Sequence, residues 1–178
     1  MKILIASDVH GSSAYLKKTV EAFDREKANI LVLLGDIYNH GPRNPLPSEY
    51  APMSVSEILN GIKDQLIVVK GNCDSQVDTL ISDFDFIEDM LVISGNKKVL
   101  LTHGHVFNKD NLPKTKVDAI IYGHFHTGFI EVKDGVVCAN AGSVSLPKNN
   151  TENSYIILED DVITLKNLNG KELIRKTI

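Results

Sequence analysis

Short apolar runs alternate with polar, glycine-containing turns along the whole chain. In the first half, three runs are apolar at nearly every position, which predicts strands buried on both faces: residues 2–7, 30–34 and 66–70. Between the first two runs, the apolar positions Leu16, Val20 and Phe23 recur with helical spacing. The chain therefore opens on a predicted strand–helix–strand unit, which favours parallel strands.

Serines and prolines mark the expected starts of two helices. Ser12 or Ser13 precedes the first apolar stripe and predicts its N-cap. A long loop over residues 38 to about 52 carries four prolines, which restrict the backbone and favour a stiff wall around a site. After this loop, Ser54 or Ser56 predicts the N-cap of a short second helix.

The second half of the chain is rich in strands. Gly95-Asn96 separates two apolar runs and predicts a hairpin. Further strand-like runs follow between turns, at residues 119–122, 128–133, 136–139, 155–158 and 162–168. This change predicts a single domain over residues 1–178, with two sheets that face each other and helices outside.

Composition restricts the function only modestly. Hydrophobic residues make up 43% and charged residues 24%, as in ordinary globular proteins. The formal net charge of -4 argues against general nucleic-acid or membrane binding through bulk charge, whereas bound divalent cations would still allow a phosphorylated substrate. Two cysteines cannot form a disulfide framework, and the apolar run at the start is too short for a signal peptide. We therefore expect a cytoplasmic protein.

Metal-binding residue types follow several of the predicted strands. The histidines lie in or beside short motifs with Gly, Asp or Asn: Asp8-Val9-His10-Gly11, Gly35-Asp36, Asn39-His40-Gly41, Gly71-Asn72-Cys73-Asp74, Thr102-His103-Gly104-His105 and Gly123-His124-Phe125-His126. Strand ends of an open α/β sheet lie along one rim, so these side chains are expected to meet there. In Asp8-x-His10, an extended backbone would point both side chains to the same side.

Each motif alone has a simpler interpretation. An aspartate in the position of Asp8 or Asp36 is usually a cap or turn residue, and an asparagine in the position of Asn72 is usually a turn residue. A lone histidine is more often a surface or hydrogen-bonded core residue than a ligand. Five histidines at strand ends, with two aspartates and an asparagine, are poorly explained in this way. The whole set predicts a metal-dependent hydrolase.

In this order, the motifs D-x-H, G-D, G-N-x-D, H-G-H and G-H-x-H resemble those of the calcineurin-like metallophosphoesterase superfamily. The resemblance spans positions 8 to 126, and residues 39–44, 71–74 and 140–147 resemble the YfcE-type branch of bacterial phosphodiesterases. It implies a four-layer α/β/β/α sandwich of two facing mixed β-sheets flanked by helices. It also implies a homo-oligomer, dimer or tetramer, that hydrolyses small phosphodiesters with a metal-bridging hydroxide.

The resemblance implies two metal positions. The first would be held by Asp8, His10, Asp36 and His126, and the second by Asp36, Asn72, His103 and His124, so that Asp36 bridges. Of the two neighbouring histidines His103 and His105, His105 is the weaker candidate for a metal ligand. The donors are all nitrogen or oxygen, which favours two Mn²⁺ ions, with Zn²⁺, Fe, Ni²⁺ or Mg²⁺ as alternatives.

The resemblance also implies catalytic and substrate-binding residues. The catalytic set is Asp36, Asn72, Cys73 and His103, and the substrate-binding set is His40, Arg43 and Asn44. Many relatives carry a proton-donating histidine where this chain has Cys73. A thiol of pKa about 8.5 is the poorer donor, so we expect slow turnover or leaving groups that need little protonation. Asp74 is a candidate to hold the ligands in place.

Two rival functions use the same residues. A phosphomonoesterase or a nuclease would use the same site, although the acidic balance weighs against a nuclease. Outside enzymes, the rival is a metal-binding scaffold, like the metallophosphoesterase-fold subunit of retromer. Loss of ligand residues would favour the scaffold, and this chain retains the whole set.

Overall fold

The structure, a computed structural model, describes residues 1–178. Its helices are α1 (Ser13–Glu26) and α2 (Pro52–Gly61), with 3₁₀ helices η1 (Lys63–Gln65) and η2 (Gln76–Ile81). Its strands are β1 (Lys2–Ala6), β2 (Ile30–Leu33), β3 (Leu66–Val69), β4 (Phe86–Ile87), β5 (Met90–Ser94), β6 (Lys97–Leu101), β7 (Ala119–Tyr122), β8 (Gly128–Lys133), β9 (Val136–Ala141), β10 (Ser154–Glu159), β11 (Val162–Asn167) and β12 (Glu172–Thr177). None of these helices has the length and apolar character needed to cross a membrane.

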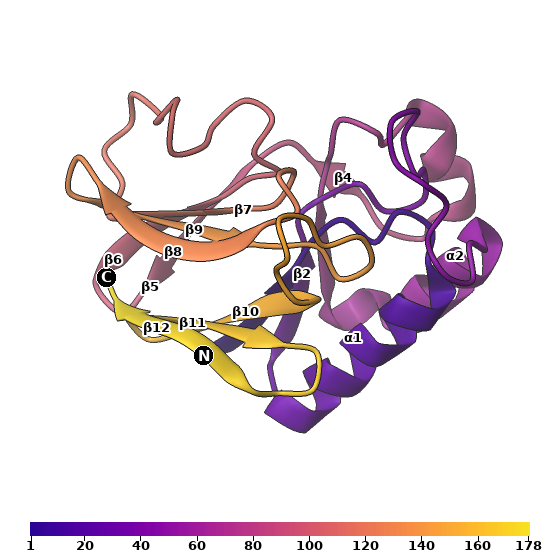
Figure 1. Ribbon diagram of the computed structural model, residues 1–178, viewed down its shortest axis with the longest axis horizontal. Coiled ribbons are helices and arrows are strands. Elements are labelled where there is room, and N and C mark those ends of the chain that lie inside the picture. Colours follow the sequence, from indigo (N-terminus) through magenta and orange to yellow (C-terminus); the bar gives the residue numbers. More distant parts are fainter.

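Two mixed sheets face each other, as predicted (Figure 1). The seven-stranded sheet has the order β12-β11-β10-β1-β2-β3-β4, with β1 to β4 parallel and β10 antiparallel to β1. The five-stranded sheet has the order β5-β6-β7-β9-β8. In it, β5 and β6 form the predicted antiparallel hairpin, whereas β7 runs parallel to both β6 and β9.

The central strands are apolar at nearly every position because both of their faces are covered. Ile5 and Val32 point into the core between the sheets, while Leu4 and Leu31 belong to the core beneath the helices. All four side chains are fully buried. Burying an apolar side chain of this size contributes about 1.5–3 kcal/mol, so these strands form the rigid centre of the fold.

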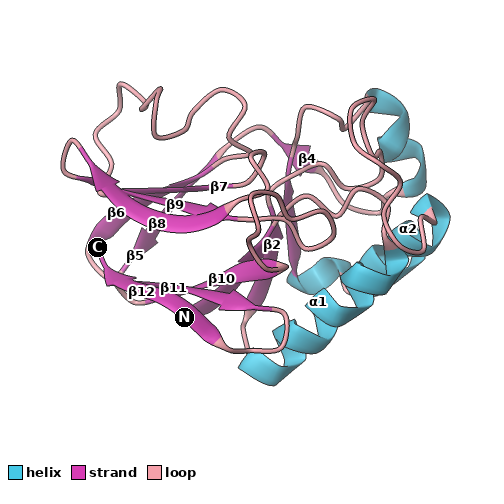
Figure 2. Ribbon diagram, viewed as in Figure 1, coloured by secondary structure: helices cyan, strands magenta, loops and turns pink.

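The two helices lie outside the seven-stranded sheet, and the outer face of the five-stranded sheet carries a loop (Figure 2). There, Phe107, Leu112 and Val117 pack against Ile120 and Tyr122 of β7. The predicted two sheets with flanking helices are therefore confirmed, but the fourth layer contains no helix.

Local side-chain bonds explain why this outer layer is a loop. The Asn108 side-chain oxygen accepts the backbone N–H groups of Asp110 (2.9 Å) and Asn111 (3.2 Å). Such short-range bonds compete with helical hydrogen bonds. Pro113 follows and lacks a backbone donor. This loop therefore covers the five-stranded sheet with apolar side chains that do not recur at helical spacing.

The helix starts agree with the sequence in one case only. Ser12 caps α1 by accepting the Tyr15 N–H (3.3 Å). Helix α2, however, begins at Pro52 and has no side-chain cap, so the prediction of Ser54 or Ser56 as its N-cap is wrong. Proline suits the first helical turn because the N–H that it lacks would have no partner there. Ser56 instead donates to the Ile81 carbonyl oxygen.

We expect Ser12→Ala to lower the free energy of unfolding by about 1–2 kcal/mol, since it removes an N-cap and the donor to the Ser48 carbonyl oxygen (2.6 Å). Ser54→Ala is the matched control, because this serine caps nothing, and it should change stability by less than about 0.5 kcal/mol. Urea unfolding of both variants checks this. Equal losses in the two variants would contradict the assignment of the cap.

Candidate metal centre

The predicted metal ligands lie just beyond the ends of central strands from both sheets. Asp8 and His10 follow β1, Asp36 follows β2, Asn72 follows β3, His103 follows β6, and His124 and His126 follow β7. Because β1 to β3 belong to one sheet and β6 and β7 to the other, the site lies where two sheet rims meet. The packing of the two sheets therefore sets the geometry of the site.

Tight turns orient five of these side chains toward the site. The backbone is left-handed at Asp8 (φ 58°), His10 (φ 50°), Asp36 (φ 55°), His124 (φ 65°) and His126 (φ 58°). Aspartate and histidine adopt this conformation more readily than most residues, yet it still costs on the order of 1 kcal/mol or more at each position. The predicted extended geometry of Asp8-x-His10 is therefore wrong: a turn, and not the alternation of a strand, brings the two side chains together.

Backbone carbonyl oxygens fix three of the histidine rings. Nδ1 of each ring lies at hydrogen-bonding distance from one of them: His10 at 2.7 Å from Asn39, His103 at 2.6 Å from Leu34, and His126 at 2.7 Å from Leu146. A carbonyl oxygen only accepts, so each Nδ1 carries a proton and donates it. In the neutral ring, Nε2 then presents a lone pair to the site, which is the form that binds metal ions.

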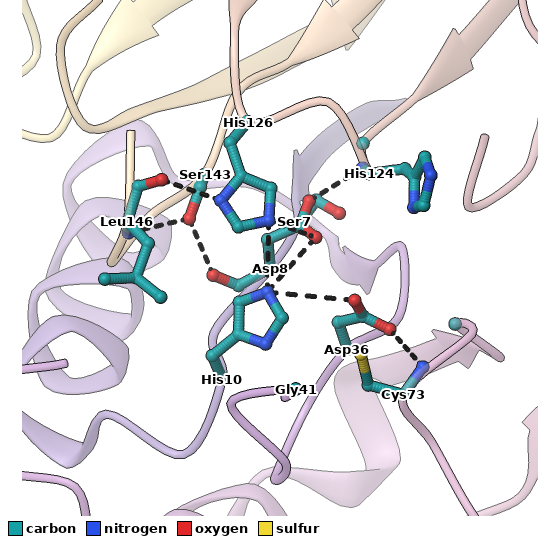
Figure 3. A network of polar contacts seen from close by, with 12 residues as sticks. Ser7, Asp8, His10, Asp36, Gly41, Cys73, His124, His126, Ser143 and Leu146 are labelled. Carbon is teal, nitrogen blue, oxygen red and sulfur yellow. Dashed lines mark hydrogen bonds and ion pairs between the residues drawn. The ribbon is translucent and has the colours of Figure 1, made fainter. Parts of the chain in front are cut away.

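These lone pairs point at other acceptors (Figure 3). Nε2 of His10 and Nε2 of His126 are 3.1 Å apart, and Asp8 Oδ1 lies 3.2 Å from the latter and 3.6 Å from the former. Asp8 is fully buried, and its Oδ1 has no hydrogen-bond donor. Three acceptors this close repel one another unless a positive charge lies among them. A cation at this point would satisfy all three atoms.

A second group of acceptors lies on the other side of Asp36. Asp36 Oδ2 is 3.7 Å from Nε2 of His10, and Asp36 Oδ1 is 3.5 Å from Nε2 of His103. That Nε2 is also 3.0 Å from Asn72 Oδ1 and 3.2 Å from Nδ1 of His124. Asp36 thus contacts both groups, as its predicted bridging role requires.

The spacing of these atoms suits six-coordinate cations. Ligand atoms at right angles around an ion, with bonds of about 2.1 Å, lie about 3 Å apart. The residues of the first group, Asp8, His10 and His126, offer ligand atoms that all lie within 4.8 Å of one another, and so do Asp8, Asp36 and His103. The same holds for His10, Asp36 and Cys73, so the thiol lies at the edge of the site.

The charges at the site favour a bound cation. Burial raises the pKa of Asp8, but the adjacent His10 and His126 rings outweigh it whenever they carry a second proton, and so lower that pKa well below its ordinary value. Burial lowers the pKa of His10, yet the adjacent Asp8 carboxylate raises it overall. Burial and the neighbouring His103 lower the pKa of His124 to about 4, so its ring is neutral. The centre therefore combines an ionised carboxylate with a neutral imidazole.

Asp74 joins the turns that carry Asp36 and Asn72. Its Oδ2 accepts the N–H groups of Asp36 (2.8 Å) and Gly71 (2.7 Å), and its Oδ1 accepts the N–H of Ile37 (2.8 Å). Three donors on one carboxylate hold the two turns at a fixed separation. Asp74 therefore positions Asp36 from behind, in line with the supporting role expected of it.

Residues 140–147 hold the opposite side of the site. The hydroxyl groups of Ser143 and Ser145 donate to the Asp8 carbonyl oxygen at 2.8 and 2.9 Å. Leu146 supplies the carbonyl oxygen that orients His126 (Figure 3). The role of these two serines was not predicted, because nothing in local spacing indicates a bond to a residue more than 130 positions away.

A groove of about 690 Å³ opens from the site. It is lined by Asp36, Asn39, Gly41, Pro42, Arg43, Asn44, Pro45, Asn72, Cys73, His124, Phe125, His126 and Lys148. Arg43 and Asn44, two of the residues predicted to bind substrate, both line this groove. The prediction missed Phe125 and Lys148, which lie far along the chain from these two.

His40 does not line the groove. Its ring packs edge-on against Tyr50, with 5.4 Å between the ring centroids. We therefore remove His40 from the predicted substrate-binding set. His105 is exposed and lies beside the second group, its ring centroid 5.4 Å from that of His103.

Comparison with known proteins decides the family. A family model described as the calcineurin-like phosphoesterase superfamily domain matches residues 1–161. The chain belongs to this superfamily. It is 41% identical to phosphodiesterase YfcE of Escherichia coli K12 over 176 residues, which covers 98% of this chain and 96% of that protein. It is also 31% identical to the probable metallophosphoesterase YsnB of Bacillus subtilis, over 93% of this chain and 89% of that protein.

Solved structures agree with this assignment. The Escherichia coli YfcE phosphoesterase superposes with a TM-score of 0.94 at 39% identity, over all of both chains. The predicted superfamily and its YfcE-type branch are thus confirmed. Vacuolar protein sorting 29 from Cryptosporidium parvum superposes with a TM-score of 0.63 at 18% identity, over 99% of this chain and 98% of that one. That likeness shows the fold alone.

We expect Gly71→Ala to disorganise the site, because a Cβ at this position would overlap the carboxylate and backbone nitrogen of Asp36. Calorimetric titration should show at least tenfold weaker Mn²⁺ binding, and the free energy of unfolding should fall by about 1–3 kcal/mol. Gly61→Ala is the matched control: a Cβ there meets nothing within 4 Å, and alanine favours helix α2. Unchanged Mn²⁺ binding in Gly71→Ala would show that this close approach does not matter.

Proposed function

We propose that this protein hydrolyses small phosphodiesters with two divalent cations, Mn²⁺ being the most effective. The observation that carries the proposal is the arrangement of the ligand atoms: two groups of nitrogen and oxygen atoms, with one oxygen of Asp36 directed to each. The groove begins at these atoms, since Asp36, Asn72, His124 and His126 all line it. A phosphoryl group in the groove would therefore reach both metal positions.

When bound, two divalent cations bind phosphate oxygens and lower the pKa of the attacking water. This chain's own residues set the geometry for that chemistry. Asp8 and Asp36 supply negative charge, and His10, His103 and His126 are locked in the metal-binding tautomer by carbonyl oxygens. Nitrogen and oxygen donors without a thiolate suit Mn²⁺ and similar ions.

Cys73 occupies the position beside the leaving group in this proposal. Its backbone N–H donates to Asp36 Oδ1 (2.8 Å), and its thiol lines the groove. Burial and the charge of Asp36 raise the pKa of the thiol to about 12, so it stays protonated and is a weak acid near neutrality. Substrates whose alcohols leave without much protonation are therefore favoured.

The rival functions have less support. A nuclease groove is usually lined by many positively charged side chains that follow the nucleic-acid backbone. Here Arg43 and Lys148 are the only lysine or arginine residues that line the groove. A metal-binding scaffold would not require a groove that opens at the ligand atoms, whereas Asp36, Asn72, His124 and His126 all line the groove here. A phosphomonoesterase would use the same centre, and a panel of matched monoesters and diesters separates the two activities.

Chelation should abolish hydrolysis of a chromogenic diester, and Mn²⁺ should restore it best. Asp36→Asn should remove both metal ions and lower kcat/KM by more than about 10³-fold, because one carboxylate serves both positions. His105→Ala is the control and should keep both ions, since this exposed ring lies outside the two groups. Elemental analysis measures the metal content. Wild-type metal content and turnover in Asp36→Asn would refute the bridging role.

Cys73→Ala should leave metal content nearly unchanged, because Asn72 supplies the proposed ligand at this turn. Cys73→His should raise kcat/KM most for diesters with poor, high-pKa leaving groups, by up to about 10²-fold, since an imidazolium donates a proton more readily than this thiol. The measurement is kcat/KM across diesters of graded leaving-group pKa. A gain of equal size for all leaving groups, or loss of metal from Cys73→Ala, would assign this position another role.

A further inference from the structure

Building on the proposed function, we infer that the groove binds a second anionic group of the substrate, with Arg43 and Lys148 as its ligands. The substrate class is then a phosphodiester in which one alcohol carries a further anionic group, such as a terminal phosphate. Phe125 lines the same groove, is 43% exposed, and offers an apolar face to the carbon chain between the two groups.

The positively charged side chains of Arg43 and Lys148 have no counter-charge in the protein. Neither the Arg43 side chain nor the Lys148 side chain takes part in any ion pair or hydrogen bond. Asp36 is the only carboxylate that lines the groove, and it faces the metal positions. The chain as a whole is acidic, with a formal net charge of -4, so this local positive charge runs against the bulk composition.

Arg43 and Lys148 belong to backbone segments that also form part of the metal centre. The Lys148 N–H donates to the His126 carbonyl oxygen (2.8 Å), and the Thr151 hydroxyl group donates to the Lys148 carbonyl oxygen (2.8 Å). Lys148 therefore follows the position of His126, whose ring contacts Asp8. The backbone of Lys148 and the proposed ligand His126 therefore belong to one connected segment.

The loop that carries Arg43 is also hydrogen-bonded to the metal centre. The Asn44 side chain donates to the His40 carbonyl oxygen (2.8 Å), and the Gly41 N–H donates to the Asn39 side chain (2.8 Å). Asn39 in turn orients His10 through its carbonyl oxygen. Figure 3 shows Gly41 of this loop near Cys73, whereas Leu146 of the other segment lies beside His126.

The charge of the reacting diester can be neutralised without the Arg43 and Lys148 side chains. Two divalent ions, when bound, would be matched by Asp8, Asp36, the attacking hydroxide and the diester itself. Asp74 is compensated by its three backbone donors. A cavity of about 690 Å³ is also far larger than a phosphate needs and falls in the range of complete small-molecule sites. The remaining positive charge and space fit a second anionic group.

The test compares two diesters that differ only at the end of one alcohol. One is nitrophenyl butyl phosphate, and the other carries a phosphonate at the end of the butyl chain. We expect the wild type to prefer the phosphonate diester about tenfold in kcat/KM. Lys148→Met and Arg43→Gln should each reduce this preference about three- to tenfold, mainly through KM. Lys17→Met, at an exposed position on α1, is the control and should keep the preference.

A preference that survives both substitutions, or an equal loss on both diesters, would overturn the inference. A second readout does not depend on catalysis: NMR titration of the metal-free protein with butylphosphonate should shift the signals of Arg43 and Lys148 in the wild type. No shift at these two residues would also overturn it. If neither diester is hydrolysed while the NMR shifts are present, the proposed function fails and the anion subsite stands.

Discussion

The orientation of three imidazole rings is the constraint on which the rest of the site depends. Each ring gives its Nδ1 proton to a backbone carbonyl oxygen, of Asn39, Leu34 or Leu146, and so turns Nε2 toward the interior. The result is a set of buried acceptors without donors, of which Asp8 Oδ1 is the clearest case. An arrangement of this kind is unfavourable in a protein by itself and becomes favourable around cations. Metal binding should therefore also stabilise the fold.

Maintaining this arrangement requires both sheets and several left-handed turns. The backbone cost at Asp8, Asp36 and His124 is offset by hydrogen bonds within the site, such as His124 N–H to Asp8 Oδ2 (2.9 Å) and Asp36 N–H to Asp74 Oδ2 (2.8 Å). The ligands at β1 and β2 belong to one sheet and those at β6 and β7 to the other. Each group of ligand atoms draws on both sheets, so the apolar core between the sheets fixes the distances within each group.

Much of this structure could be predicted from the sequence, and the failures have physical causes. The buried strands were predicted because their apolar runs are short and uniform, whereas β4 has only two residues and β12 is mostly exposed and charged, so neither shows a pattern. The candidate ligands were found because Asp, Asn and His follow strands in a recognisable order. Positions set by distant segments, such as Lys148 in the groove and His40 against Tyr50, leave no trace in local spacing.

The central claim is that two cations occupy the two groups of acceptors with Asp36 between them. A crystal structure of the Mn²⁺-loaded protein, with anomalous scattering data to locate manganese, tests it most directly. The account predicts two anomalous peaks, one among Asp8, His10 and His126 and the other among Asn72, His103 and His124, with one oxygen of Asp36 on each. A single peak, or a peak bound by the Cys73 thiol, would contradict it.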